Sequence, residues 1–174
     1  MFSRVLLVVL LSSVLIYSCT KTDIPVNDQT DSGTGNTATV VYNVNKAKLL
    51  DLVNAVRKTG CNCGSTTMPP VTAVTWNDKL AKAAYDHSVE MKTNDYFSHT
   101  GLDGSSPGQR ITAAGYSWTS YGENIAEGYS TEQIVMNAWL GSEGHCKNIM
   151  NVGFKDMGVG RDGNYWTQDF GAVR

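Results

Sequence analysis

The stretch WLGSEGHCKNIM, residues 139–150, carries a glutamate, a histidine and a cysteine within four consecutive positions. Two shorter stretches precede it in the chain: DYFSH at residues 95–99 and YGENIA at residues 121–126. In this order and spacing, the three stretches are the most specific feature of the sequence. They also contain the candidate functional side chains.

Four helices are predicted around these stretches from apolar periodicity and from helix-end signals. The first ends near Gly60, and a short third helix begins at Pro107, because glycine and proline favour those positions. Ser130 with Gln133 three positions later is a capping-box signal that opens the fourth helix. The apolar positions that set the three longer helices are Leu49, Leu52, Val53 and Val56; Leu80, Ala83, Ala84, His87 and Met91 between Asn77 and Lys92; and Ile134, Val135, Ala138 and Trp139.

The C-terminal part of the sequence changes to the period of a strand. Residues 157–161 and 165–172 predict two strands, joined at Asp162-Gly163, which is a favoured hairpin turn. Helices that come first and paired strands that come late favour an α+β or layered fold over βαβ winding. The run GVGRDG at residues 158–163 matches the dinucleotide pattern GxGxxG, but a strand is predicted to follow where that fingerprint needs a helix, so the match is rejected.

Composition and charge exclude one class of partner. The chain has 174 residues, of which 41% are hydrophobic, and a formal net charge of −2. This describes one globular domain with additional chain, and it lacks the basic footprint of a nucleic-acid-binding protein. No GxSxG elbow, P-loop or HExxH motif is present in the sequence.

The first 18 residues predict a lipoprotein signal peptide. Arg4 precedes an apolar run, residues 5–17, that is shorter than the roughly 20 residues a spanning helix needs and suits a signal-peptide core. The run ends in IYSC, residues 16–19, which resembles the lipobox of bacterial lipoproteins except for the bulky Tyr17. That resemblance implies acylation of Cys19 and a stable membrane anchor. A plain secretory signal or a buried N-terminal helix is the alternative.

The remaining chain divides into two parts. Residues 19–44 are poor in apolar side chains and predict a flexible tether, because such a segment buries too little surface to offset its conformational entropy. Residues 45–174 are expected to form the folded domain. The protein is therefore expected to be exported and lipid-anchored to a bacterial membrane, on its periplasmic side or at the cell surface.

Taken together, the three stretches resemble the bacterial branch of the CAP family, also called the SCP-like or cysteine-rich secretory protein family. Its members carry an FSH, a GENIA and a W-x-x-S-x-G-H segment before a glycine-rich hairpin, and the resemblance extends over residues 47–172. WNDKL at residues 76–80 and DGSSP at residues 103–107 are similar to further family segments. The resemblance implies a three-layer α/β/α sandwich with a small, mainly antiparallel sheet and a surface cleft.

In the family, two histidines and one or two acidic residues line that cleft. Carried over to this sequence, they are His99, Glu123 and His145. The second acidic position has no clear equivalent, because Glu143 stands where bacterial relatives usually have proline.

Three roles are open for these residues. Two imidazoles and a carboxylate suit a divalent cation (zinc, magnesium or calcium), with His99 and His145 as the metal ligands. A histidine and a glutamate also suit general acid–base chemistry, which makes His99, Glu123 and His145 catalytic candidates. Alternatively, the three residues form a hydrogen-bonded network that only fixes loops.

Other chemically active residues have simpler interpretations. His87 lies on the apolar face of its predicted helix and is expected in the core, whereas Asp78 and Glu90 are expected on solvated helix faces. The aromatic side chains expected to pack in the core and sheet are Trp76, Trp139, Tyr165, Trp166 and Phe170.

The cysteines indicate an oxidising compartment. If Cys19 is acylated, three remain, and a Cys61–Cys63 bridge would close a very tight loop, so Cys146 is expected to pair with one of the two. The resemblance favours Cys63–Cys146, because bacterial relatives more often have a cysteine aligned with Cys63. A zinc cluster of Cys61, Cys63, Cys146 and His145 is the competing interpretation.

Two main functions follow from these residues. We expect a membrane-anchored, extracytoplasmic CAP-domain protein, monomeric and without a nucleic-acid partner, that binds a small ligand, a lipid, a divalent cation or a protein. The alternative is a metal-dependent, peptidase-like hydrolase that uses the same cleft, so whether the chain is an enzyme stays open. A structural envelope protein is a third possibility.

Overall fold

A computed structural model describes residues 41–173, so the predicted signal peptide, Cys19 and residues 19–40 of the predicted tether lie outside the described residues. The described part contains five α-helices, a short 3-10 helix and two sheets. In chain order the elements are η1 (Val41–Asn43), α1 (Lys46–Thr59), β1 (Cys61–Cys63), β2 (Thr66–Met68), β3 (Thr75–Trp76), α2 (Asp78–Thr93), α3 (Pro107–Ala113), β4 (Trp118–Glu127), α4 (Glu132–Gly141), α5 (Glu143–Ile149), β5 (Asp156–Asp162) and β6 (Tyr165–Val173).

The central sheet has four strands in the order β3-β5-β6-β4. The pairs β5–β6 and β6–β4 are antiparallel, and only the two-residue strand β3 runs parallel to its neighbour. The predicted hairpin is confirmed, because Asp162 pairs with Tyr165 across the turn. Strand β4, which contains the YGENIA stretch, lies at the edge of the sheet.

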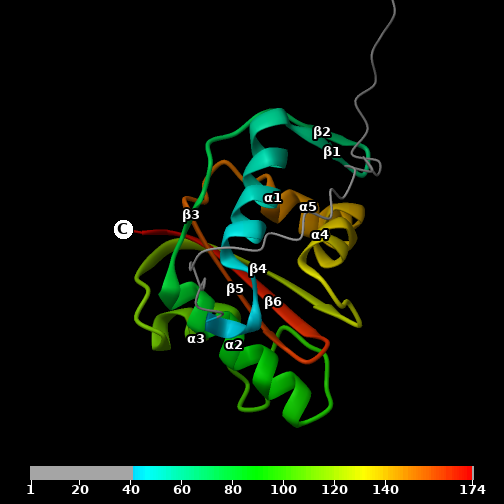
Figure 1. Cartoon of the computed structure of the whole chain (residues 1–174). Coiled ribbons are helices and arrows are strands. Elements are labelled where there is room, and N and C mark those ends of the chain that lie inside the picture. Colours follow the sequence, from blue (N-terminus) through cyan, green and yellow to red (C-terminus); the bar gives the residue numbers. More distant parts are fainter. Residues whose placement is uncertain (1–40, 174) are drawn as a thin grey trace, which may run out of the picture.

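Helices cover both faces of this sheet, which confirms the three-layer sandwich (Figure 1). On one face, α2 lies directly on β5, because a Cβ atom at Gly158 or Gly160 would collide with the backbone of α2. The Ser88 hydroxyl on α2 also donates to the Thr167 hydroxyl on β6. On the other face, α1, α4 and α5 enclose a second core layer. Its large buried side chains include Leu49, Val53, Trp139, Ile149, Met157, Trp166 and Phe170.

The helix ends follow local signals. Gly60 has a φ of 74° and ends α1, and Ser106 and Gln109 form a capping box around Pro107 at the start of α3. The predicted capping box of the fourth helix is wrong by one residue. The N-cap of α4 is Thr131. Its side-chain oxygen accepts a hydrogen bond from the Ile134 amide, so α4 begins one residue later than the Ser130 signal predicted.

One buried arginine joins α1 to the segment that follows α5. The Arg57 side chain is fully buried, and its guanidinium donates to four backbone carbonyl groups. The acceptors are Thr72 O at 2.8 Å, Ile149 O at 2.6 Å, Asn151 O at 3.0 Å and Phe154 O at 3.2 Å. These bonds fix the C-terminal end of α5, which is the helix that carries His145.

The predicted packing of the aromatic residues is confirmed for four of them. Trp139, Tyr165, Trp166 and Phe170 are buried, whereas Trp76 is only partly buried. Asp78 is confirmed as a solvated residue, with 74% of its side chain exposed.

Candidate functional site

The edge strand β4 carries side chains to both faces of the sheet. Side chains alternate along a strand, so Glu123 faces the α2/α3 side and Asn124 faces the α5 side. Asn124 donates from Nδ2 to the backbone oxygen of His145 at 3.2 Å. Glu123 instead contacts His99, which lies in the segment between α2 and α3. These contacts place the His99 ring at Glu123 and the backbone of His145 at Asn124, the next residue of β4.

Glu123 is a buried carboxylate with a hydrogen-bond donor on each oxygen. Only 2% of its side chain is exposed, and its Oε1 lies 2.7 Å from His99 Nδ1. Its Oε2 accepts from Arg110 Nη2, also at 2.7 Å. Arg110 donates further to the backbone oxygens of His99 and Ser105. The cost of burying one carboxylate is thus offset by a guanidinium and an imidazole, both of which it orients.

The contact with Glu123 determines which nitrogen of the neutral His99 ring carries the proton. A carboxylate only accepts hydrogen bonds, so in the neutral imidazole the proton is on Nδ1 and Nε2 is the basic nitrogen. The His99 side chain is 51% exposed, which leaves the ring accessible to ligands.

His145 has the electrostatic environment of a neutral imidazole. Burial lowers the pKa of His145, and the electrostatic effect of the nearby His99 lowers it further. Both effects disfavour the imidazolium form.

The segment that carries His99 is anchored to α2 by two side chains. His87 is buried and its Nε2 lies 2.8 Å from Ser98 O, which confirms its interpretation as a satisfied core histidine. Glu90 was predicted on a solvated helix face, and it is only partly solvated, with 28% of its side chain exposed. Its Oε1 accepts from the Leu102 amide at 3.0 Å and its Oε2 lies 3.3 Å from His87 Nδ1, because the loop after α2 folds back over this turn of the helix.

The described residues show no serine prepared to act as a nucleophile. The Ser98 hydroxyl accepts from the Thr100 amide at 3.0 Å. Within residues 41–173, no hydrogen bond joins Ser98 or Ser142 to either candidate histidine. The serine–histidine pair of an acyl-transfer enzyme is therefore not assembled in this part of the chain.

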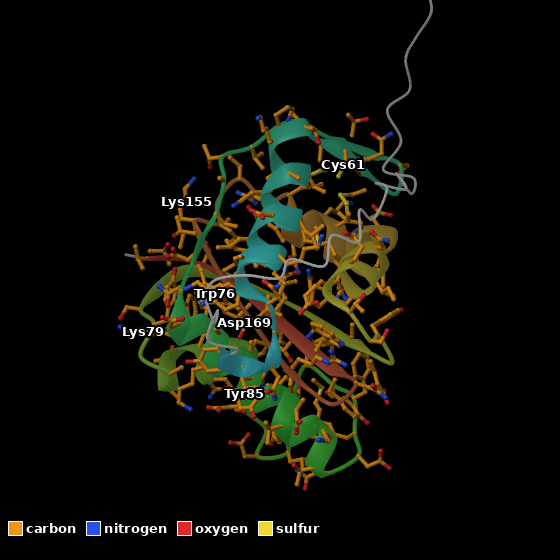
Figure 2. The ribbon with its side chains drawn as sticks, viewed as in Figure 1. Cys61, Trp76, Lys79, Tyr85, Lys155 and Asp169 are labelled. Atoms are coloured by element: carbon orange, nitrogen blue, oxygen red, sulfur yellow. A yellow bond between two sulfur atoms is a disulfide. The ribbon has the colours of Figure 1, made fainter. Side chains whose placement is uncertain are left out.

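Asp169 is a site residue that sequence reasoning missed. It pairs with Glu123 across strands β4 and β6, is 1% exposed, and lies in the interior of the molecule (Figure 2). Its Oδ1 has no hydrogen-bond partner. Burial, and next the charge of Glu123, raise the pKa of Asp169 well above its ordinary value, so this carboxyl group is held in its protonated form. Thr167, Gln168 and Asp169 are three consecutive polar residues in a buried strand, and that pattern was the available signal.

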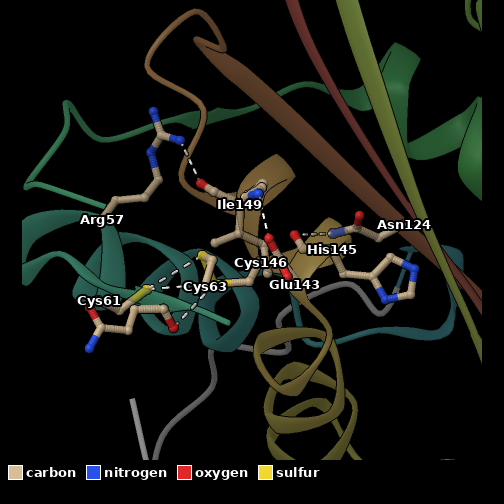
Figure 3. Close-up of a disulfide and its surroundings, with 10 residues drawn as sticks. Arg57, Cys61, Cys63, Asn124, Glu143, His145, Cys146 and Ile149 are labelled. Atoms are coloured by element: carbon tan, nitrogen blue, oxygen red, sulfur yellow. Dashed lines mark hydrogen bonds and ion pairs between the residues drawn. A yellow bond between two sulfur atoms is a disulfide. The ribbon is translucent and has the colours of Figure 1, made fainter. Parts of the chain in front are cut away.

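The disulfide predicted from the resemblance is confirmed. Cys63 and Cys146 are bridged, with a Cα–Cα distance of 5.4 Å. The competing zinc cluster is wrong, because the bridge uses two of its thiolates and the His145 ring points away from the sulfur atoms (Figure 3). Among residues 41–173, only Cys61, Cys63 and Cys146 bring three possible ligand atoms within 4.8 Å of one another. His99, Glu123 and His145 are thus not closed into a three-ligand cluster.

A hollow of about 390 Å³ lies beside this site, between α3 and β4. It is lined by seven residues, Ser106, Gly108, Gln109, Thr112, Ala113, Trp118 and Tyr121. The Trp118 and Tyr121 rings pack edge to face with their centroids 4.6 Å apart. None of the three candidate residues lines this hollow, so the predicted cleft between the histidines stays a prediction.

The arrangement of helices and strands is that of the SCP fold. An extracellular protein from Bacillus anthracis that contains an SCP domain superimposes with a TM-score of 0.67 at 31% identity, covering 80% of this chain and 45% of that one. An outer surface protein from Borrelia burgdorferi superimposes with a TM-score of 0.60 at 22% identity, covering 74% of this chain and 90% of that one.

The cysteine-rich secretory protein (CAP) family model matches residues 50–170, and this chain therefore belongs to the CAP family. The Bacillus subtilis protein YkwD, described as uncharacterized, is 42% identical over 96 residues, covering 54% of this chain and 37% of YkwD. The uncharacterized membrane protein YlbC of the same organism is 33% identical over 131 residues, covering 75% of this chain and 35% of YlbC. The matched part thus spans little more than a third of either relative.

Similar structures from B. anthracis and B. burgdorferi are described as extracellular or outer-surface proteins. Within residues 41–173 of this chain, no helix has the length and apolar character needed to cross a bilayer.

Proposed function

We propose that this protein is an exported, membrane-anchored CAP-domain binding module that holds a divalent cation through the imidazoles of His99 and His145. The observation that carries the proposal is the 2.7 Å contact between His99 Nδ1 and the buried Glu123 carboxylate. Histidines that bind metals usually donate their second ring N–H to such a carboxylate, which fixes the tautomer and raises the basicity of the ligand nitrogen. Glu123 has the orienting role in this arrangement, since both of its oxygens already accept hydrogen bonds.

The chemistry of the two histidines favours zinc over magnesium or calcium. Imidazole nitrogens suit zinc, whereas magnesium and calcium prefer oxygen ligands. The lowered pKa of His145 supports this assignment, because a neutral imidazole binds a metal without first releasing a proton. Two protein nitrogens leave the other coordination positions to water or to a ligand, so the proposed site is open.

Titration calorimetry with zinc chloride tests the proposal. The wild-type chain is expected to bind one zinc ion, and His99→Ala and His145→Ala are each expected to abolish that binding while remaining folded by circular dichroism. Glu123→Gln is expected to weaken it by about 10- to 100-fold, as the loss of a carboxylate behind a ligand histidine does. Asp86→Asn, which changes an exposed carboxylate paired with Lys82, is the matched control and should leave the affinity unchanged. Equal zinc affinity in wild type and both histidine variants would refute the site.

The hydrolase alternative uses the same residues and is tested with the same variants. It requires peptide or ester hydrolysis that is sensitive to a chelator and is lost in both His99→Ala and His145→Ala. Hydrolysis that persists at the wild-type rate in both variants would assign the activity to a contaminant. The His99–Glu123 contact alone does not favour this alternative, because an oriented imidazole serves binding and catalysis equally well.

Export and anchoring form the second part of the proposal. They are supported by the lipobox-like residues 16–19 and by the extracellular and outer-surface relatives. Expression of the full chain and of its Cys19→Ser variant in a bacterium tests the anchor, with radiolabelled palmitate as the probe. Labelled wild type in the membrane fraction and unlabelled Cys19→Ser are expected. Equal labelling of both chains would exclude Cys19 as the acylation site.

A further inference from the structure

A third sulfur atom lies beside the disulfide. Cys61 and Cys63 are two residues apart on β1, so their side chains point to the same side of the strand, where α5 presents Cys146. Cys61 Sγ is 3.7 Å from Cys146 Sγ and 4.0 Å from Cys63 Sγ (Figure 3). All three side chains are buried, with exposed fractions of 6% for Cys61 and 0% for the other two.

We propose that these three cysteines form a thiol–disulfide exchange site, in which Cys61 replaces Cys63 as the partner of Cys146. This inference is independent of the cation site, because it rests only on the sulfur atoms. The bridge in the structure is Cys63–Cys146, and Cys61 is outside it.

The exchange balances without an external oxidant or reductant. Cys61 loses its proton, and the resulting thiolate attacks Cys146 Sγ, which forms the Cys61–Cys146 bond. The Cys63–Cys146 bond breaks, its electron pair leaves on Cys63, and Cys63 takes up a proton. One thiol and one disulfide are present before and after the reaction.

Geometry selects Cys146, and not Cys63, as the sulfur that Cys61 attacks. Cys146 Sγ is the nearer of the two. Attack on Cys63 would bridge two residues of one strand whose Cα atoms are about 6.6 to 6.8 Å apart, at the upper limit for a disulfide. A Cys61–Cys146 bond needs the present 3.7 Å between the two sulfur atoms to shorten to about 2.05 Å.

The exchange should be slow. Cys61 Sγ lies beside the existing bond and not at its end, since its distances to the two bridged sulfurs differ by only 0.3 Å, from 3.7 to 4.0 Å. Displacement at sulfur proceeds in line, so β1 has to move before Cys61 reaches the far side of Cys146. Minutes to hours is the timescale of uncatalysed disulfide rearrangement.

Both isomers tether α5 to β1, but at points two residues apart. Cys146 directly follows His145, and Asn148 on the same helix donates to Glu123 O and to Asn124 Oδ1. A change of bridge therefore alters the attachment of the helix that contacts the candidate site, while the covalent link is kept.

The Cys63→Ser variant of the full chain provides the first test, with Cys61→Ser as the matched control. Both are oxidised in the same glutathione buffer, alkylated, digested without reductant and mapped by mass spectrometry, with the Cys19 peptide followed in the same digest. Cys61→Ser is expected to form the Cys63–Cys146 bridge, and Cys63→Ser is expected to form Cys61–Cys146. Alkylated Cys61 and Cys146 in a folded Cys63→Ser variant, next to a bridged control, would overturn the proposal.

A second measurement uses the unaltered chain and does not depend on the folding of a variant. The protein is incubated at mildly alkaline pH without any added thiol, quenched in acid, unfolded and labelled with N-ethylmaleimide. Fragment spectra then place the label on Cys61 or on Cys63. Label that appears on Cys63 over hours, and faster at higher pH, is the expected result, because the thiolate is the attacking form. Label confined to Cys61 at all times would rule out the exchange.

Discussion

Glu123 and Asp169 occupy paired positions on β4 and β6, so two buried carboxyl groups lie next to each other in the sheet beneath His99. Two adjacent carboxylates would repel each other. Glu123 is bound by Arg110 and His99, and the raised pKa of Asp169 keeps a proton on that carboxyl group, so the repulsion is avoided. The pair explains how the site contains a second acidic residue with only one negative charge.

This pair predicts an unusual dependence of stability on pH. The pKa of Asp169 is raised in the folded protein, so above about pH 4 the folded state binds a proton that the unfolded state has released. Stability is then lost as the pH rises, by about 1.4 kcal/mol per unit until the folded pKa is passed. Asp169→Asn is expected to remove this loss, which urea unfolding at a series of pH values measures. Asp86→Asn is the control, and parallel curves for wild type and Asp169→Asn would contradict the prediction.

The ion pair between Glu123 and Arg110 predicts a large loss of stability when it is broken. Their side chains are 2% and 11% exposed, so Glu123→Gln leaves a guanidinium in the interior without its counter-charge. The expected cost is about 3 to 5 kcal/mol, measured by urea unfolding at neutral pH. Glu143→Gln breaks the exposed pair with Lys147 and should cost less than about 1 kcal/mol. An equal loss of unfolding free energy in the two variants would show that burial does not make the Glu123–Arg110 pair more stabilising than the exposed one.

His145 is predicted to titrate below the ordinary range of a histidine. Burial lowers the pKa of His145, followed by the charge of His99, so His99→Gln should raise the pKa of His145 partway towards its ordinary value. The resonances of the ring protons, followed by NMR as a function of pH, measure this shift. An unchanged titration of His145 in His99→Gln would mean that the two rings do not interact.

The same shift gives a second expectation for stability. Because the pKa of His145 is lowered on folding, the unfolded chain binds the additional proton first as the pH falls below about 6.5. The contribution of His145 is therefore fully present above that pH and is lost as the pH falls towards the folded pKa. His145→Asn should not show this loss in acid unfolding curves.

Contact between α2 and β5 predicts that Gly158 tolerates no larger residue. A Cβ at this position would collide with the backbone of α2 at Leu80 and Ala81, which cannot move as a flexible side chain can. Gly158→Ala should therefore destabilise the protein by about 3 kcal/mol or more, at the upper end of overpacking costs. Gly144→Ala is the control, because the added methyl group meets nothing within 4 Å in α5 and should be neutral or stabilising by up to about 1 kcal/mol. Thermal unfolding of both variants measures the difference.

Elements with strong local signals were predictable from the sequence. The helices α1 to α3 follow from apolar periodicity together with Gly60 and Pro107, and the β5–β6 hairpin follows from its Asp-Gly turn. Strand β4 was not predicted, because residues 123–126 are buried on both faces and so show no alternation of polar and apolar side chains. The seven-residue helix α5 is too short to show a period.

The candidate site was predictable only in part. Family resemblance, and not spacing, brought His99 and Glu123 together, and the structure shows that they are in contact. That Arg110 and Asp169 lie beside Glu123 could not be predicted, because this placement depends on the register between β4 and β6 and on where α3 packs. Strand register is a tertiary property that no local pattern in these residues encodes.

Three of the four carbonyl groups that Arg57 binds belong to the end of α5 and to the connection that follows it, at Ile149, Asn151 and Phe154. Residues 150–154, between α5 and β5, lie outside the sheet, and they are arranged around one planar, permanently charged side chain from α1. A lysine carries the same charge but lacks the fork of five fixed N–H donors, so it would leave some of these carbonyls unsatisfied in the interior. The shape of that connection consequently depends on a residue nearly a hundred positions upstream, as the separations of 92, 94 and 97 positions to Ile149, Asn151 and Phe154 show.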